Sequence, residues 1–210
     1  MLRRAFELVG PLSTARRAAR EELAEAWRGE LDEEETLERV LGKEFPEPGD
    51  WVGLRRENRR VQVALMMDTS LSMSGRNLAL AAVAAAVLAF KVRSEDLAVV
   101  AFESAAKVLS RLGEHDRTAR IVEGILAQPA RGFTNIAAAL QAGRSELERG
   151  DNPRRVGLLI SDGVYTAGDD PTAEAGRFPR LHVLLTEDYT MDLELARRMA
   201  RLGRGKVFTV

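Results

Sequence analysis

The sequence predicts an α/β fold, a doubly wound and mostly parallel sheet with helices on both faces, preceded by a short helical N-terminal segment. After about residue 60, short apolar runs alternate with longer helix-like stretches. The chain has 210 residues, which is enough for one such domain with an appendage. Hydrophobic residues make up 45% and charged residues 30%, as is typical of a globular protein. Because strand and helix alternate, a parallel sheet covered on both faces is the simplest architecture.

Residues 1 to about 50 are charged and helix-prone, and no segment among them has a convincing strand pattern. Ser13 together with Arg16 to Trp27 predicts one helix. Asp32 can cap a second helix, because its side chain can accept a hydrogen bond from a free backbone N–H of the first turn. The apolar face of this second helix consists of Leu37, Val40 and Leu41.

The segment 45–50, which contains two prolines and a glycine, interrupts this pattern and predicts a hinge or domain boundary. We therefore expect a helical N-terminal extension over residues 1–50 and an α/β domain over residues 60–210. The extension can pack against the domain, with Trp27 and Trp51 as anchors, or it can dock the domain onto a larger assembly. The residues favour neither role.

The α/β domain is predicted from the alternation of short apolar runs and helix-like stretches in residues 60–210. Its helix around Leu78 to Phe90 is rich in alanine and too short to cross a membrane, so we interpret it as packed in the core. The expected strands are 61–67, 96–102, 107–109, 155–160, 181–185 and 206–210. The expected helices are 76–92, 117–126, 135–149 and 191–202.

The overall composition limits the classes of partner. The formal charge of −1 does not favour nucleic acid or an anionic membrane surface. The absence of cysteine excludes disulfides, thiolate zinc sites and cysteine nucleophiles, and it fits a reducing compartment. No signal peptide or membrane-spanning pattern is found, so we expect a cytoplasmic protein without nucleic-acid or membrane partners.

The most informative segment is Asp68-Thr69-Ser70-Leu71-Ser72, directly after the expected strand 61–67. Ligands bind at the carboxyl ends of parallel strands, and one carboxylate with two hydroxyls can converge there on a single point. These are hard oxygen ligands, which suit magnesium, manganese or calcium. Alternatively, Ser72 or Ser74 caps the next helix and Asp68 only stabilises a turn.

Two further segments add oxygen-bearing side chains of the same kind. In Gly132-Phe133-Thr134-Asn135, a threonine stands at the head of a helix. In Ile160-Ser161-Asp162-Gly163, a strand ends at an aspartate, which places Asp162 on the same edge of the sheet as Asp68. The structural alternatives are a helix N-cap for Thr134 and a turn for Asp162.

The order and spacing of these residues resemble the metal-ion-dependent adhesion site of von Willebrand factor type A domains. The resemblance covers about residues 60–210. The residues that carry it are Asp68, Ser70, Ser72, Thr134 and Asp162, the last followed by Gly163. Two positions depart from the family pattern, because Leu71 and Phe133 stand where smaller residues are usual, and both place an apolar side chain at the rim of the site.

The resemblance implies a chemistry for the site. The first and fourth strands would be neighbours, so that Asp68 and Asp162 flank the crevice between them. By analogy, Ser70, Ser72 and Thr134 contact a Mg²⁺ ion (or Mn²⁺ or Ca²⁺) through their hydroxyls, and the two aspartates act mostly through water. A shell of neutral hydroxyls leaves the cation undercompensated, so an Asp or Glu carboxylate of a partner protein would complete it. The expected function is therefore a divalent-cation-dependent protein–protein interaction module and not an enzyme.

The resemblance also suggests a biological setting. Bacterial intracellular proteins of this family, CoxE-like or associated with magnesium chelatase, often act beside AAA+ ATPases. The chain resembles an accessory subunit of such an ATPase in metal-cofactor insertion or complex maturation. A different interpretation is a stress-response or adhesion-type adaptor without an ATPase partner. Fold alone does not decide between them.

The same residues argue against several classes of enzyme. A magnesium-dependent phosphatase or phosphotransferase of the haloacid-dehalogenase type also has an aspartate after its first strand, but it needs a second carboxylate where this chain has Ser70. No phosphate-binding loop and no Gly-x-Ser-x-Gly motif is present. The two histidines, His115 and His182, are expected to be structural or solvated. Asp169 and Asp170 are interpreted as solvated loop charges.

Overall fold

The computed structural model describes residues 17–22, 30–43, 45–57, 60–115, 118–186 and 191–209. The chain divides into two compact units at Arg59 and Arg60. The described part of the larger unit is 60–209, and that of the smaller unit is 17–57. Within the described residues, no helix has both the length and the apolar character needed to cross a bilayer.

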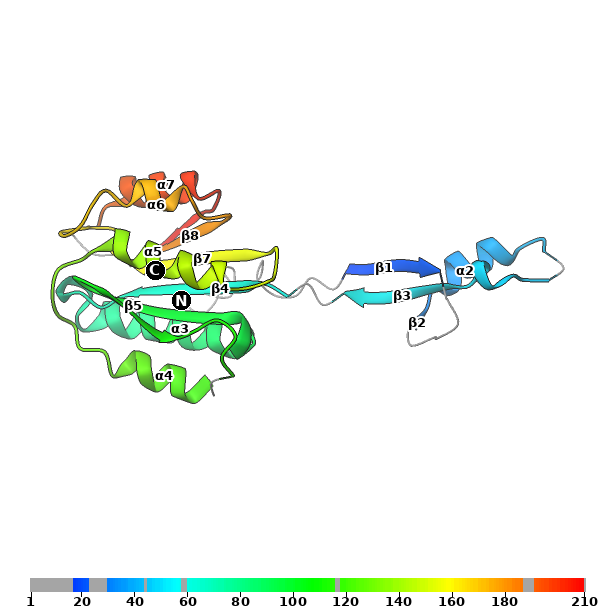
Figure 1. Ribbon diagram of the computed structural model, residues 1–210, viewed down its shortest axis with the longest axis horizontal. Coiled ribbons are helices and arrows are strands. Elements are labelled where there is room, and N and C mark those ends of the chain that lie inside the picture. Colours follow the sequence, from blue (N-terminus) through cyan, green and yellow to red (C-terminus); the bar gives the residue numbers. More distant parts are fainter. Residues whose placement is uncertain are drawn as a thin grey trace. The chain divides into compact units, whose positions relative to one another are not determined.

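The larger unit contains a six-stranded sheet in the order β6-β5-β4-β7-β8-β9. All neighbouring strands are parallel except β5 and β6, which are antiparallel. This confirms the predicted, mostly parallel sheet, and the single antiparallel strand lies at one edge (Figure 1). The strands are β4 (Gln62–Asp68), β5 (Leu97–Phe102), β6 (Ala106–Ser110), β7 (Arg155–Ser161), β8 (Leu181–Leu185) and β9 (Val207–Thr209).

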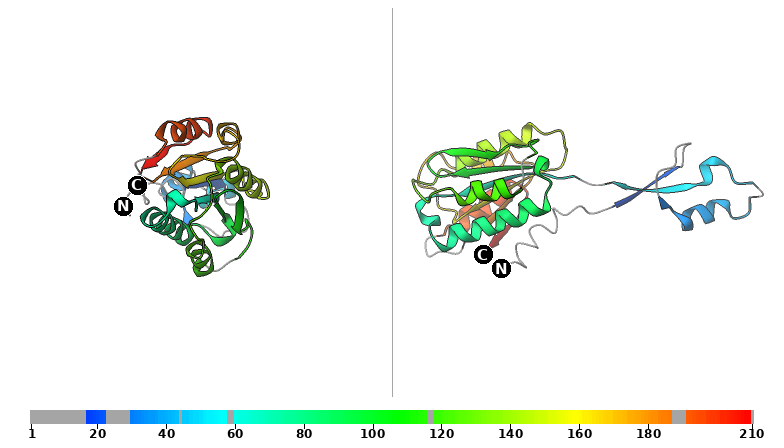
Figure 2. Two further views of the ribbon diagram at one scale, coloured as in Figure 1. Left: turned by 90° about the vertical axis from the view of Figure 1, so that its left-hand side faces the viewer. Right: turned by 90° about the horizontal axis from the view of Figure 1, so that it is seen from below.

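Helices cover both faces of this sheet, as Figures 1 and 2 show. On one face α3 (Arg76–Lys91) and α4 (Thr118–Leu126) pack on Val63, Leu65 and Met67 of β4. On the other face α5 (Ile136–Glu148), α6 (Thr172–Ala175) and α7 (Leu193–Leu202) pack with Ala64 and Met66. Side chains of a strand alternate between faces, so a strand buried on both sides must be apolar throughout, as β4 is.

The predicted elements of this unit agree with the structure to within a few residues at most ends. The short helix α6 was not predicted, because its four residues are too few to show a helical period. The prediction that the stretch from Leu78 to Phe90 packs in the core holds only for one face of α3. Phe90 is 78% exposed and Val83 is also exposed, because only one side of α3 faces the sheet.

Strand β4 lies in the middle of the sheet, between β5 and β7. The chain therefore continues from β4 to one side through β5 and returns to the other side through β7. The helices on the two sides cover opposite faces, so β4 and β7 flank the point where the connections change direction. Ligands bind at such a point, outside the carboxyl ends of the strands. In sequence terms these ends are Asp68 and Ser161.

The smaller unit differs from the helical segment that the sequence predicted. Its strands β1 (Arg17–Glu22), β2 (Glu30–Leu31) and β3 (Val52–Glu57) form an antiparallel sheet in the order β1-β3-β2. The prediction of a helix over Arg16 to Trp27 is therefore wrong for the residues of β1. The sequence of β1 has intrinsic helix propensity, but pairing along its whole length with β3 overrides that local preference. Trp27 lies outside the described residues.

The second predicted helix of this unit is present as α2 (Glu33–Val40). The carboxylate of Asp32 accepts a hydrogen bond from the backbone N–H of Glu35 at 3.2 Å, which confirms the predicted N-cap. Thr36 fixes the helix to β3, because its hydroxyl accepts a hydrogen bond from the N–H of Val52 at 3.1 Å. The predicted apolar face is largely exposed within this unit, since Leu37 and Leu41 are both exposed. Trp51 is exposed as well.

The packing of β7 against the segment before β8 gives a test of the core. A Cβ atom added at Gly157 would lie 2.6 Å from Cε1 of Phe178, a fully buried ring. We expect Gly157→Ala to lower the free energy of unfolding by about 1–3 kcal/mol, because the ring cannot move without disturbing its neighbours. Chemical denaturation followed by circular dichroism measures this change.

The matched control is Gly124→Ala in α4, where an added Cβ would meet no atom within 4 Å. Alanine is the better helix former by up to about 1 kcal/mol, so this variant should be as stable as the parent or more stable. Equal stability of the two variants would contradict the close packing at Gly157.

Candidate metal centre

Two buried aspartates lie at the carboxyl ends of neighbouring strands. Asp68 is the last residue of β4, and Asp162 directly follows β7. The two strands are paired in parallel up to Met67 and Ile160, so Asp68 lies beside Ser161 and Asp162 follows one residue later. Both aspartates have an exposed fraction of 0%. Two acidic groups are thus removed from water at adjacent positions, which is unfavourable unless other groups compensate their charge.

The hydroxyl of Ser161 lies between the two carboxylates. Its Oγ donates a hydrogen bond to Oδ2 of Asp68 at 2.6 Å and lies 3.5 Å from Oδ1 of Asp162. The hydroxyl is held in place by the N–H of Gly163, which donates to it at 3.1 Å. Ser161 is not among the site residues predicted from the sequence. A serine directly before an Asp-Gly turn at a strand end was the available signal, but its role depends on the neighbouring strand.

The loop after β4 supplies two more hydroxyls. The N–H of Ser70 donates to Oδ1 of Asp68 at 2.9 Å, which bends the chain back over the strand end. The Oγ atoms of Ser70 and Ser72 are 3.1 Å apart, so these side chains converge. Helix α3 begins after Gly75 with no side-chain cap, so neither Ser72 nor Ser74 caps it. The capping alternative for these serines is therefore wrong.

Thr134 lies on a third loop of the same edge. The N–H of Arg131 donates to the carbonyl of Thr69 at 3.0 Å, which joins this loop to the loop after β4. The hydroxyl of Thr166, from the loop after β7, accepts a hydrogen bond from the N–H of Thr134 at 2.9 Å. The carbonyl of Thr134 accepts in turn from the N–H groups of Thr166 and Ala167 at 2.9 and 3.2 Å. Thr134 is thus fixed between the two loops that carry the aspartates.

The capping alternative for Thr134 is also wrong. The N-cap of α5 is Asn135, whose side chain accepts a hydrogen bond from the N–H of Ala138 at 3.0 Å. The side chain of Thr134 is buried and does not serve the helix. Thr166, like Ser161, was not identified from the sequence, because its contribution arises only where two loops meet.

The electrostatics of the site show an excess of negative charge. Burial raises the pKa of Asp68 from 3.8 to about 6, and the negative charge of Asp162 adds to the increase, while hydrogen bonds from Ser161 and Ser70 oppose it. Oδ1 of Asp162 accepts from the N–H of Val164 at 3.0 Å, but Oδ2 is buried without a partner. Among the described residues two other buried side-chain atoms lack a partner, Arg144 Nε and Glu174 Oε2, and these oppositely charged groups are 3.6 Å apart.

These features fit a hard divalent cation. An unpartnered buried carboxylate oxygen and converging hydroxyls are the ligands that magnesium, manganese and calcium prefer. In the described parts of the chain, no group of three or more His, Cys, Asp or Glu side chains is arranged to hold a metal ion. The candidate site, with two carboxylates and three hydroxyls, does not need such a group. Its five side chains offer no nitrogen or sulfur ligand of the kind typical of structural zinc sites.

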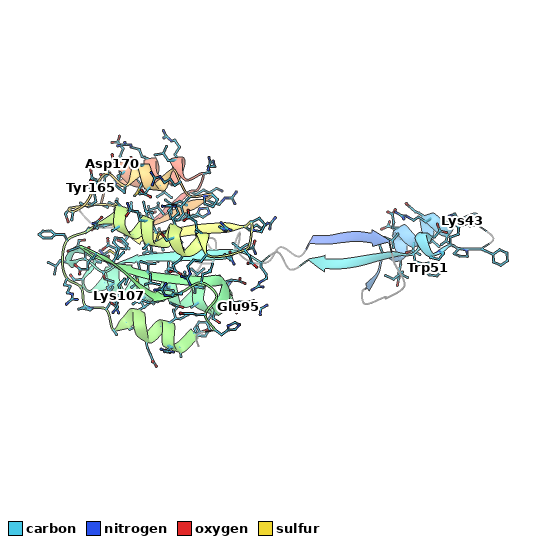
Figure 3. All side chains as sticks on the ribbon, viewed as in Figure 1. Lys43, Trp51, Glu95, Lys107, Tyr165 and Asp170 are labelled. Carbon is cyan, nitrogen blue, oxygen red and sulfur yellow. The ribbon has the colours of Figure 1, made fainter. Side chains whose placement is uncertain are left out.

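Two further acidic residues at this edge lie on the solvent-facing loop after β7. Asp169 and Asp170 are both exposed, and the N–H of Thr172 donates to Oδ1 of Asp170 at 2.8 Å. The hydrogen bonds from Thr172 lower the pKa of Asp170. Figure 3 shows Asp170 and Tyr165 at one end of the larger unit and Glu95 at the opposite end.

The chain resembles known proteins both in sequence and in fold. Residues 63–164 match the family model of the von Willebrand factor type A domain. The matched range begins within β4, ends just after β7 and includes all five predicted metal ligands. No curated protein sequence matches the chain significantly.

Several solved structures share the fold at low sequence identity. Protein BatB from Bacteroides thetaiotaomicron is 15% identical with a TM-score of 0.56, covering 71% of this chain and 90% of that one. A von Willebrand factor type A protein from Catenulispora acidiphila is 18% identical with a TM-score of 0.59, covering 76% and 40%. Proximal thread matrix protein 1 from the mussel byssus, solved with a zinc-occupied MIDAS motif, is 18% identical with a TM-score of 0.61, covering 71% and 41%.

The larger unit therefore has the fold of a von Willebrand factor type A domain, and its residues 63–164 match the model of that family. The chain spans less than half the length of two of these three structures, so it shares with them a domain and not a whole protein. The five residues that carried the sequence resemblance lie on three loops at the ligand-binding edge of this fold. Direct hydrogen bonds connect Asp68 to Ser70 and Ser161, and backbone hydrogen bonds fix the loop of Thr134 beside them.

The raised pKa of Asp68 predicts a stability effect in metal-free protein. The pKa in the folded state, about 6, is above the ordinary value of 3.8, so protonation stabilises the fold fully below about pH 4, and this stabilisation is lost as the pH rises through about 6. Asp68→Asn removes the buried charge. In the presence of a chelator at neutral pH, we expect it to raise the free energy of unfolding by roughly 1–3 kcal/mol.

Urea denaturation at a series of pH values tests this expectation, and the advantage of the variant should shrink toward about pH 4. The control is Asp169→Asn, which removes an exposed charge from the same edge and should leave stability nearly unchanged. A less stable Asp68→Asn protein at neutral pH would show that the carboxylate is well compensated without a cation.

Proposed function

We propose that the larger unit binds one divalent cation at the carboxyl edge of its sheet and uses it to hold a carboxylate of a partner protein. The observation that carries the proposal is the unpartnered buried Oδ2 of Asp162, whose carboxylate is bridged to that of Asp68 by Ser161. The loop that follows Asp68 adds the converging hydroxyls of Ser70 and Ser72. Removing two carboxylates from water in this way is costly, and a bound cation offsets the cost.

The ligands of the proposed site divide into two kinds. Ser70, Ser72 and Thr134 would hold the cation through their hydroxyls, as the family resemblance suggests. Asp68 and Asp162 would act mainly through water, which magnesium gives up reluctantly. A shell with neutral direct ligands leaves part of the cation's positive charge unbalanced. A glutamate or aspartate of another protein supplies the balancing negative charge.

Magnesium is the proposed ion, with manganese and calcium as the alternatives of the same hard class. All five proposed ligands are oxygen donors, which favours these ions over soft metals. The mussel protein was solved with zinc in its MIDAS motif, so that motif holds a divalent cation in that protein.

Binding and not catalysis is proposed for this site. Ser70 occupies the position where a phosphatase of the haloacid-dehalogenase type would need its second carboxylate. Ser161 donates its proton to a carboxylate and accepts from Gly163, so it is held as a bridge and is not presented as a nucleophile. His182 accepts a hydrogen bond from the N–H of Lys206 at 3.1 Å between β8 and β9, away from the site.

The proposed setting is that of an accessory subunit acting beside an AAA+ ATPase in the cytoplasm, in metal-cofactor insertion or complex maturation. This finer role is supported by the resemblance to CoxE-like and magnesium-chelatase-associated proteins. The smaller unit is a second folded element that such an assembly could engage. Co-purification of the full chain with an ATPase, dependent on added magnesium, would distinguish this role from that of an adaptor without an ATPase.

Metal binding is tested by thermal unfolding with Mg²⁺ or Mn²⁺ against a chelator. Because a ligand of the folded state stabilises by mass action, a metal concentration about 100-fold above Kd should add about 2.7 kcal/mol, or roughly 5–10 °C in Tm. Asp68→Ala should fold but lose the metal-induced shift. Thr134→Ala should weaken it, while the control Asp169→Ala keeps it.

Partner capture gives the second readout of the same variants. Asp68→Ala should abolish metal-dependent capture of an acidic partner, and Thr134→Ala should weaken that capture more than it lowers stability. The absence of any Tm shift at millimolar metal, or unimpaired capture by Asp68→Ala, would contradict the proposal.

A further inference from the structure

Large apolar side chains are exposed around the candidate metal centre. Leu71 and Phe133 are 63% and 66% exposed, and Tyr165 and Met191 are 39% and 37% exposed. We call these four residues the apolar rim. The larger unit has four other exposed large hydrophobic residues in its described part, and these lie on helices: Val83, Phe90, Leu126 and Leu202. The exposed apolar residues on its described loops therefore gather at one edge.

Each rim residue adjoins a residue of the site or a residue bonded to the site. Leu71 stands between Ser70 and Ser72, and Phe133 directly precedes Thr134. Tyr165 directly precedes Thr166, whose hydroxyl accepts from the N–H of Thr134.

Met191 completes the rim from the loop after β8. It directly precedes Asp192, and the N–H of Asp192 donates to the carbonyl of Asp162 at 3.0 Å. The rim is therefore assembled from four separate loops, after β4, before α5, after β7 and before α7. Each of these loops carries a residue of the candidate site or is hydrogen-bonded to one.

Two of the rim residues, Leu71 and Phe133, are held by hydrogen bonds of their backbone groups. The N–H of Phe133 donates to Oγ of Ser104 at 3.0 Å, and the N–H of Ser74 donates to the carbonyl of Leu71 at 3.1 Å. Apolar groups on rigid backbone contribute more to binding than mobile ones, because less conformational entropy is lost. Grouped exposed apolar side chains on a folded surface are typical of interaction sites.

We infer that the apolar rim receives apolar side chains that flank the partner's carboxylate, so that the partner presents an Asp or Glu between large aliphatic or aromatic residues. This inference rests on the proposed function. Contact between the flanks and the rim would exclude water from around the carboxylate, and the attraction between opposite charges is stronger where water is excluded. An acidic segment with polar flanks would leave the rim exposed and gain neither effect.

Three synthetic peptides test the inference with the full chain. One has a central Glu flanked by Leu and Phe, the second has the same Glu flanked by Ser, and the third has Gln between Leu and Phe. Fluorescence anisotropy is measured with Mn²⁺ and with a chelator. We expect the first peptide to bind at least about tenfold more tightly than the second, in Mn²⁺ only, and the third not to bind.

The matched variants separate the rim from the metal ligands. The double variant Leu71→Ser with Phe133→Ser should reduce the preference for apolar flanks to about twofold or less while the Mn²⁺-induced shift in Tm is kept. The control, Val83→Ser with Phe90→Ser, removes exposed apolar residues of similar size from α3 and should leave the preference unchanged.

The outcomes distinguish this inference from the proposed function. Equal affinity for the two Glu peptides, with binding still dependent on Mn²⁺, would overturn the inference and leave the proposed function standing. Metal-independent binding of the Gln peptide at the rim would overturn the inference too. No Mn²⁺-induced Tm shift and no effect of the chelator on peptide binding would overturn the proposed function and the inference together.

Discussion

The burial of two carboxylates at adjacent strand ends is the constraint on which the local structure of this domain depends. Asp68 and Asp162 have no exposure, and while both oxygens of Asp68 accept a hydrogen bond, Oδ2 of Asp162 has no partner. Ser161 and the backbone N–H groups of Ser70 and Val164 supply what compensation there is. The tight turns after both strands follow from these bonds, because each aspartate accepts from a backbone N–H two residues further along. This costly arrangement is the reason why we propose a bound cation at the site.

The sheet topology produces this arrangement. Strand β4 is central and pairs in parallel with both β5 and β7, so its carboxyl end meets that of β7. The apolar side chains of β4 fill cores on both faces and leave the strand no freedom to shift its register. A shift of one residue would put Thr69 in the position of Asp68 and exchange the two faces of the strand. The precision of the site is therefore set by packing several residues away from it.

The sequence predicted the α/β unit well because its strands are continuous apolar runs and its helices are long. It failed for β1, whose residues favour a helix until β3 pairs with them. The five oxygen-bearing positions were identifiable from order and spacing, but the roles of Ser161 and Thr166 were not. A hydroxyl has no distinctive pattern in one dimension, and its partners here lie on other strands or loops. For the same reason, the sequence did not reveal which of two neighbouring residues caps α5. The structure shows that the cap is Asn135 and not Thr134.

In the proposed function, cation binding at the buried carboxylates and partner binding at the apolar rim are thermodynamically linked. A cation that is held by neutral hydroxyls and by aspartates acting through water gains little from the protein alone, and a partner carboxylate adds the missing charge. By thermodynamic reciprocity, the carboxylate must then strengthen cation binding by the same factor as the cation strengthens carboxylate binding. Apolar contacts at Leu71 and Phe133 would act on both equilibria, because they stabilise only the state in which the carboxylate is present. In the proposed function, cation, carboxylate and rim form one coupled recognition unit, and the selectivity for a partner would reside in the rim, since the charge alone fits any acidic side chain.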